Sequence, residues 1–247
     1  SVISLADPYS LHMNYSKYAM VGAALVEKPK RALCIGLGAG TLPKFFATKF
    51  PECQVDVAEL DPKVVDVARN YFFLPEMPNL SVTVMDGRQF VRKSEGKYDL
   101  VFLDAYRDKM IPFHLLTKEF LEELKTKLAP GGVVVSNIAI ETDAQLYPWV
   151  LRTYQNAFGT LLEVNVPNTI NRVLLGFAGK SAVTLSAVTA RAGVLASSTT
   201  LGYDLVACAG LYRDVSSGQP SKNILTDDYA PVNLMRIRKA DEKDWQY

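Results

Sequence analysis

The alternation of two kinds of segment constrains the fold of this chain more than any other sequence feature. Short apolar runs rich in β-branched residues alternate with stretches in which apolar residues recur at helical spacing. The expected strands cover residues 31–37, 54–60, 80–85, 98–104, 132–138, 161–167 and 171–178, and the expected helices cover 41–50, 62–72, 88–94, 117–128 and 144–158. Strands that are separated by helices run parallel, so this order predicts an α/β sheet with helices on both faces.

The end of the pattern differs from its beginning. Only a few residues near Asn168 join the last two expected strands, and so short a connection forces them to be antiparallel. We therefore expect a seven-stranded, mostly parallel sheet that ends in an antiparallel hairpin. No repeat or linker divides the chain, so we expect one domain over 1–247. Its expected parts are a helical N-terminal extension (1–28), the core sheet (29–180), and C-terminal helices and tail (181–247). The extension is expected to hold a helix over 10–27. The C-terminal part is expected to hold helices at 182–194 and 200–211 and a polar loop at 214–223.

A glycine-rich loop follows the first expected strand, in the sequence "GLGAG" at 36–40. Gly36, Gly38 and Gly40 let the backbone turn sharply and approach a ligand, and the next helix points its N-terminus at that ligand. An ordinary glycine-rich turn is the alternative interpretation. The spacing G-x-G-x-G, followed by Thr41, differs from the G-x-G-x-x-G/A of dinucleotide-binding loops.

Carboxylates end the next two strands. Glu59 lies about twenty residues beyond the loop, where a carboxylate commonly binds ribose hydroxyls. Asp86, followed by Gly87, can accept a hydrogen bond from an adenine amino group. The alternative interpretation is that Glu59 and Asp86 are ordinary acidic residues at the ends of strands. Together with the glycine loop they predict an adenosine site at the carboxyl ends of the strands.

Composition excludes several functional classes. The chain of 247 residues carries 27 basic and 26 acidic residues, which gives no electrostatic reason to expect nucleic acid or an acidic membrane surface as partner. There is no apolar run of membrane-spanning length and no signal peptide, and the cysteines Cys34, Cys53 and Cys208 lack metal-site or redox spacing. We expect a cytoplasmic protein without a metal. The chain starts at Ser1 rather than Met, which leaves a longer natural N-terminus open.

Several segments in this order resemble one known group of enzymes. "CIGLGAGTLPKFF", "VDVAELDPKVVDVARNYF", "VMDGRQFV", "YDLVFLDAY" and "LAPGGVVVSNI" are similar to the class I S-adenosylmethionine-dependent transferases, and most closely to their spermidine-synthase-like branch. The likeness covers roughly residues 10–178, and "IPFHLLTKEFLEEL" and "ILTDDYAPVN" share it. It implies the Rossmann-like class I methyltransferase fold, a homodimer, and S-adenosylmethionine or its decarboxylated form as donor.

The same resemblance assigns roles to residues. It implies that the glycine loop holds the methionine part of the donor, Glu59 the ribose and Asp86 the adenine. Asp104, at the end of the fourth expected strand, falls where the group places a reaction-site acid. Its carboxylate would take a proton from an amine acceptor or anchor that acceptor, and the alternative is a structural acid.

The chain departs from true spermidine synthases at several places. Ala39 replaces the loop aspartate that binds the amine of the decarboxylated donor, and Arg107 replaces the second acid of a D-x-x-D pattern. Tyr15-Ser16-Lys17 stands where Tyr-His-Glu is usual, and a Tyr-Pro-Gly acceptor motif is missing. The N-terminal hairpin domain that roofs the polyamine site in those enzymes is either missing or cut off from this sequence. We therefore expect methyl transfer to a small-molecule or protein amine. The alternatives are a polyamine aminopropyltransferase and a non-catalytic S-adenosylmethionine-binding module.

The acceptor pocket is expected to include Tyr15, Tyr106 and Asn137, although Tyr15 equally suits packing on the sheet. Asp108 and His114 follow Asp104 in the same loop, and a lone histidine is most simply read as a packed or capping residue. Asp227 and Asp228 in "LTDDYAP" are expected to form a turn rather than return to the pocket.

Overall fold

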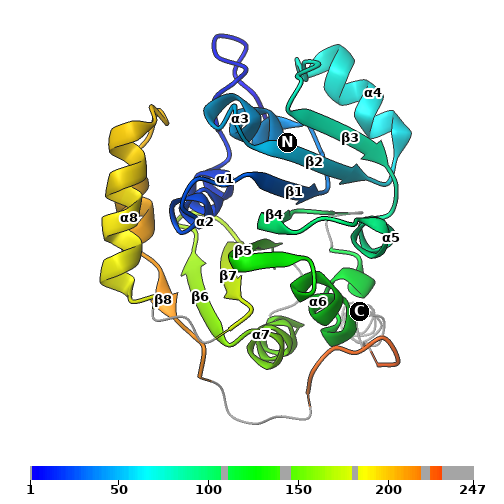
Figure 1. The fold of residues 1–247 in the computed structure, drawn as a ribbon, viewed down its shortest axis with the longest axis vertical. Helices are drawn as coiled ribbons and strands as arrows, with labels where there is room; N and C mark the ends of the chain where they lie inside the picture. Colours follow the sequence, from blue (N-terminus) through cyan, green and yellow to red (C-terminus); the bar gives the residue numbers. More distant parts are fainter. Residues whose placement is uncertain (1, 107–110, 140–145, 180–182, 218–222, 230–247) are drawn as a thin grey trace, which may run out of the picture.

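The computed structural model describes residues 2–106, 111–139, 146–179, 183–217 and 223–229. Within these residues the chain forms an eight-stranded sheet of order β3-β2-β1-β4-β5-β7-β6-β8 (Figure 1). Its strands are β1 (Arg31–Ile35), β2 (Gln54–Glu59), β3 (Leu80–Val84), β4 (Tyr98–Leu103), β5 (Leu128–Ala139), β6 (Thr160–Asn165), β7 (Asn171–Phe177) and β8 (Arg213–Asp214). Strands β1 to β5 pair in parallel, and β7, β6 and β8 are antiparallel to their neighbours. The expected α/β fold with an antiparallel hairpin is confirmed.

Helices cover both faces of this sheet (Figure 1). They are α1 (Asn14–Ala19), α2 (Val21–Ala24), α3 (Thr41–Lys49), α4 (Pro62–Tyr71), α5 (Gly87–Lys93), the 3₁₀ turn η1 (Phe113–Leu115), α6 (Lys118–Lys125), α7 (Leu146–Ala157), α8 (Leu185–Ser198) and α9 (Leu205–Gly210). One buried apolar cluster joins the sheet to α1–α4, α8 and α9, and a second joins it to α5–α7 and η1. Burial on both faces explains the continuous apolar runs in β1 and β4.

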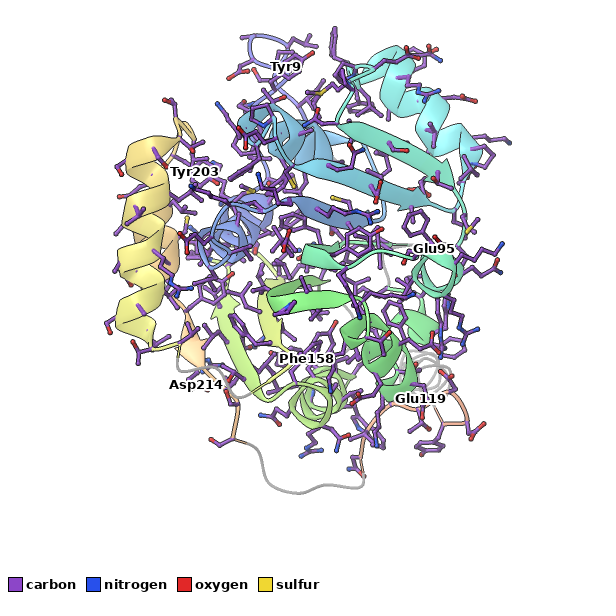
Figure 2. The ribbon with its side chains drawn as sticks, in the orientation of Figure 1. Tyr9, Glu95, Glu119, Phe158, Tyr203 and Asp214 are labelled. Atoms are coloured by element: carbon purple, nitrogen blue, oxygen red, sulfur yellow. The ribbon has the colours of Figure 1, made fainter. Side chains whose placement is uncertain are left out.

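Two glycines allow helices to pack closely against the sheet. Gly22 in α2 faces Val135, and a Cβ atom at Gly22 would lie 2.3 Å from that side chain. Gly176 in β7 lies under Phe158, the residue after α7 that is labelled in Figure 2, and a Cβ there would come within 2.8 Å of the ring. The backbone can approach at these points only because the glycines lack a side chain.

The structure corrects four expectations. The sheet has eight strands rather than seven, because the two-residue strand β8 pairs with β6. The single helix expected over 10–27 is two short helices that meet at Met20, and β5 begins at Leu128, within the range assigned to the preceding helix. The C-terminal helices are also shifted, to Leu185–Ser198 and Leu205–Gly210.

Side chains mark the starts of the helices that border the ligand edge. Asp61 caps α4 by accepting from the Lys63 N–H, with Pro62 at the first helical position as expected. Asp86 caps α5, and Thr117 caps α6. Because β1–β4 are parallel, the loops before these helices gather at one edge of the sheet. No helix among the described residues is long and apolar enough to span a membrane.

Candidate functional site

A cavity of about 690 Å³ opens at the carboxyl ends of β1–β5. The expected site residues that line it are Tyr15, Gly36, Gly38, Glu59, Asp86, Gly87, Asp104, Tyr106 and Asn137. Gly40 does not line the cavity, and Arg107 and Asp108 lie outside the described residues. The fold therefore brings nearly all of the separated positions to one hollow, which has the size of small-molecule sites.

The glycine loop turns through backbone conformations that suit glycine. Gly36 has φ +96°, and a Cβ atom on it would lie 2.5 Å from the carbonyl oxygen of Asp104. Gly38 has φ +54° and Gly40 has φ +69°. Gly40 is the N-cap residue before α3 and faces the side chain of Leu74, so it turns the chain and packs there rather than lining the cavity.

Glu59 joins two loops at the cavity wall. Its Oε2 accepts a hydrogen bond of 2.9 Å from the Leu37 N–H, and its Oε1 accepts one of 3.0 Å from the Asp61 N–H. The carboxylate is thereby held between the glycine loop and the start of α4. Each oxygen keeps a lone-pair direction that can accept a further hydrogen bond, for example from a hydroxyl.

Asp86 is held from two sides. Its Oδ1 accepts from the Gln89 N–H at 3.0 Å, and its Oδ2 lies 3.0 Å from Nε2 of His114. Burial alone raises the pKa of Asp86, but these hydrogen bonds and the nearby imidazole outweigh it and lower the pKa. His114 lines the cavity, which corrects its expected packing or capping role. Nothing in the local sequence marks this contact, because its partner lies 28 residues away.

Asp104 is held by neutral donors. The Tyr15 hydroxyl donates to Oδ2 at 2.9 Å, and the Asn137 amide donates to Oδ1 at 2.8 Å. Removal from bulk water raises the pKa of Asp104 to about 6, although both hydrogen bonds act to lower it. A carboxylate that gains and loses its proton near neutral pH is suited to general base chemistry.

Further polar groups orient Asn137. Its Oδ1 accepts from Nδ2 of Asn171 at 2.9 Å, which leaves its own amide hydrogens facing Asp104. The Tyr106 hydroxyl donates to the Asn137 carbonyl at 2.7 Å and accepts from the Ala139 N–H at 2.9 Å. Sequence reasoning missed Asn171, since it opens β7 and meets β5 only through the antiparallel pairing.

Thr41 places an unsatisfied hydroxyl beside the glycine loop. Its Oγ1 is buried and has no hydrogen-bond partner among the described residues, and Thr41 lines the cavity at the first residue of α3. A buried polar atom without a partner is costly unless a ligand or water satisfies it. The cavity wall therefore offers a polar contact near the positive end of a helix.

The other acidic candidates lie elsewhere. Asp227 forms an ion pair with Arg88 and accepts from Thr117, so it does not line the cavity. Lys17 also does not line it. The described part of the chain contains no group of three or more histidine, cysteine, aspartate or glutamate side chains that could hold a metal ion.

Comparison with known proteins finds the model of the spermine/spermidine synthase domain over residues 13–163. A polyamine aminopropyltransferase of Vibrio vulnificus is 32% identical over 231 residues, which cover 92% of this chain and 76% of that protein. A probable polyamine aminopropyl transferase of Bifidobacterium longum is 30% identical, over 92% of this chain and 54% of its own. The eEF1A lysine and N-terminal methyltransferase of Mus musculus is 28% identical over 160 residues, 61% of this chain and 23% of that protein.

Solved structures agree with the fold. Human methyltransferase-like protein 13, in complex with SAH, matches 90% of this chain and 99% of its own with TM-score 0.70 and 21% identity, which speaks for the fold alone. A probable spermidine synthase from Corynebacterium glutamicum matches 77% of this chain and 74% of its own, with TM-score 0.64 and 25% identity. The chain thus belongs to the spermine/spermidine synthase family, a branch of the S-adenosylmethionine-dependent methyltransferase superfamily.

Proposed function

We propose that this protein transfers an alkyl group from an adenosyl sulfonium donor to an amine, and that aminopropyl transfer is the first candidate. The observation that carries the proposal is Asp104, held by Tyr15 and Asn137 on the wall of a cavity that also presents Glu59 and Asp86. These groups supply a base on one side and an adenosine cradle on the other.

In this proposal the donor lies across the ends of β1–β3. The backbone at Gly36 and Gly38 approaches its chain, Glu59 accepts from the ribose hydroxyls, and Asp86 accepts from the adenine amino group. Gly87 lines the same cavity, and a Cβ atom there would lie only 2.4 Å from Ile35. This placement of the donor is supported by two observations. Glu59 and Asp86 can each accept a further hydrogen bond, and the hydroxyl of Thr41 has no hydrogen-bond partner in the part of the chain that the structure describes.

The sulfonium donor supplies an electrophilic carbon next to a positively charged sulfur. An ammonium acceptor cannot attack it until a proton leaves, and Asp104 accepts that proton. The amine nitrogen then forms the new C–N bond as the C–S bond breaks, and the thioether carries away the electron pair. Tyr15 and Asn137 keep the carboxylate aimed at the attack line, which is the part of catalysis that positioning provides.

The relatives favour aminopropyl transfer over the methyl transfer expected from the sequence. Two relatives matched over 92% of this chain are called aminopropyl transferases, whereas the methyltransferase relative covers 61% of it. Lys17 is not on the cavity wall, so a cationic acceptor bound there would not contact it.

Methyl transfer remains the second candidate because of one residue. Ala39, which is buried and does not itself line the cavity, stands in the glycine loop where the resemblance to spermidine synthases places an aspartate that binds the free amine of the decarboxylated donor. An aspartate at that point would repel the carboxylate of intact S-adenosylmethionine, and alanine does not. The nearby Thr41 hydroxyl, at the N-terminus of α3, is suited to receive that carboxylate.

The choice of donor separates the candidates. We would measure binding of S-adenosylmethionine and its decarboxylated form by calorimetry, then incubate each with putrescine and identify products by mass spectrometry. A mass gain of one aminopropyl group supports the first candidate, and preference for intact S-adenosylmethionine supports the second. Ala39→Asp is the matched variant, expected to shift preference toward the decarboxylated donor by about tenfold or more. Binding of either donor without turnover of any amine would leave a binding module, and binding of neither would end the proposal.

A further inference from the structure

The C-terminal segment 223–229 is tied to the helices beside the cavity. It runs next to α6 (Figure 1), where the Lys118 N–H donates to the Leu225 carbonyl at 2.8 Å. The Leu225 N–H in turn donates to Oγ1 of Thr153 in α7 at 2.9 Å, and the Leu225 side chain is fully buried. This anchoring fixes the position of Asp227, two residues further on.

Asp227 bridges two separate elements. Its carboxylate receives both Nη1 and Nη2 of Arg88 in α5, at 2.8 and 2.7 Å. Its Oδ1 also accepts from the hydroxyl of Thr117, the N-cap of α6, at 2.7 Å. Its own N–H donates to Oε2 of Glu119, which lies in the first turn of α6 (Figure 2), at 2.9 Å. A bidentate pair of this kind fixes orientation as well as distance.

The start of α5 and the segment η1–α6 also meet at the cavity wall. Arg88 lies two positions after Asp86, and Thr117 lies three positions after His114. Asp86 and His114 are themselves 3.0 Å apart on the cavity wall. Two contacts therefore join the start of α5 to the segment η1–α6. The contact between Asp86 and His114 lies on the cavity side, and the link through Asp227 lies outside the cavity.

Asp227 is one of the two carboxylates that pair with the arginines of α5. Arg88 pairs with Glu123 and Asp227, and Arg92 pairs with Glu123. Without Asp227, the two arginines share a single carboxylate, and Thr117 loses the acceptor that connects it to α5. Arg88 and Arg92 still reach Glu123 in the second half of α6, but the part of the link at the start of α6, next to η1, is then lost.

We infer that Asp227 is a positioning residue for the donor: it sets the spacing of Asp86 and His114 at the adenine end of the cavity. This inference rests on the proposed function for the identity of the ligand. The Asp104 end is held by a separate set of hydrogen bonds, from Tyr15 and Asn137, and does not depend on Asp227. Loss of Asp227 consequently weakens donor binding and leaves acceptor recognition unchanged.

Asp227→Asn in the full chain tests the inference. The dissociation constant of S-adenosylhomocysteine, measured by calorimetry, is expected to rise about tenfold, as for loss of a charged hydrogen bond near the site. The KM for the acceptor should stay within about twofold. Asp227→Glu, which keeps the charge, should recover most of the affinity. Asp204→Asn is the control, since Asp204 caps α9 away from the cavity by accepting from the Ala207 N–H at 2.9 Å.

A second measurement does not need the donor. The chain contains two histidines, so the imidazole NMR signals of His114 can be followed with His12 as an internal reference. In Asp227→Asn the His114 signals should shift and the His12 signals should not. Unchanged His114 signals, unchanged donor affinity, or an equal loss in Asp204→Asn would each overturn the inference. If the wild type fails to bind S-adenosylhomocysteine, the proposed function fails, and the His114 signals alone decide whether Asp227 sets this contact.

Discussion

Asp104 and Glu163 are both carboxylates at the sheet, one half-buried and the other fully buried, and they have different neighbours. Asp104 accepts from a tyrosine hydroxyl and an asparagine amide, which carry no charge. Glu163 in β6 is fully buried and is bound by Arg172 of β7 and Arg213 of β8, at 2.6 and 2.8 Å. The Tyr147 hydroxyl of α7 also donates to Glu163.

Their pKa values respond in opposite directions. Burial raises the pKa of both groups, and for Asp104 it prevails, giving a value of about 6. For Glu163 the hydrogen bonds from Tyr147, Arg172 and Arg213 outweigh burial and lower the pKa. Asp104, whose hydrogen-bond donors are neutral, can exchange a proton near pH 6. Glu163, whose charge is balanced by arginines, instead links β6 to β7 and β8.

The largest expected effect is on catalysis. Asp104→Asn removes the proposed base and should lower kcat by about 10²–10⁴-fold, the usual contribution of a positioned base. Steady-state kinetics with the donor that binds best provides the measurement. Affinity for S-adenosylhomocysteine should stay within about threefold, because Glu59 and Asp86 are unchanged. Retention of more than a tenth of the activity would mean that another group accepts the proton.

The next effect is on stability. Glu163→Gln should lower the free energy of unfolding by about 3 kcal/mol, because it leaves two arginines without their buried partner. Urea denaturation followed by circular dichroism measures it. Glu52→Gln is the control: Glu52 pairs with Lys30 at the surface with both side chains exposed, and such pairs contribute about 0–1 kcal/mol. Equal losses in the two variants would show that Glu163 has no special structural role.

The pH dependence of stability should separate the two carboxylates. The pKa of Asp104 is higher in the folded state, about 6 against an ordinary 3.8, so protonation favours the folded state. As the pH falls from 7 to 5, wild type should gain about 1 kcal/mol relative to Asp104→Asn. The lowered pKa of Glu163 has the opposite sign: its contribution is present above its ordinary value of 4.5 and is lost as the pH falls below it. Denaturation at pH 7, 5 and 3.5 checks both, and a constant difference between wild type and Asp104→Asn from pH 7 to 5 would contradict the first.

The smallest expected effect is on kcat and comes from Asn171, which acts on Asp104 through Asn137. Asn171→Ala removes the donor that orients the Asn137 amide, and should lower kcat about fivefold, close to the value of one hydrogen bond. Its acidic pH–rate limb should move upward, because Asp104 loses a fixed donor. Asn165→Ala, at an exposed position of β6, should change neither quantity. A stability loss without movement of the pH–rate limb would make Asn171 merely structural.

That the glycine loop, Glu59 and Asp86 meet at one cavity could be predicted because their sequence signals are local. The glycine loop, Glu59 and Asp86 each end a strand, and parallel strands bring their carboxyl ends to one edge whatever the details of packing. The site contacts that were missed join residues far apart in the chain. The Tyr15 hydroxyl reaches Asp104 across 89 positions, and Asp227 reaches Arg88 across 139. No periodicity records such pairs.

The sequence by itself determined that the sheet is mostly parallel with an antiparallel end, and which groups follow its parallel strands, because hydrophobic periodicity and glycine conformation act over a few residues. Only the tertiary structure decided what surrounds each carboxylate. Neutral donors meet Asp104 and arginines meet Glu163 because helices and strands from distant parts of the chain pack there. Those neighbours, rather than the acids themselves, set the two opposite pKa shifts.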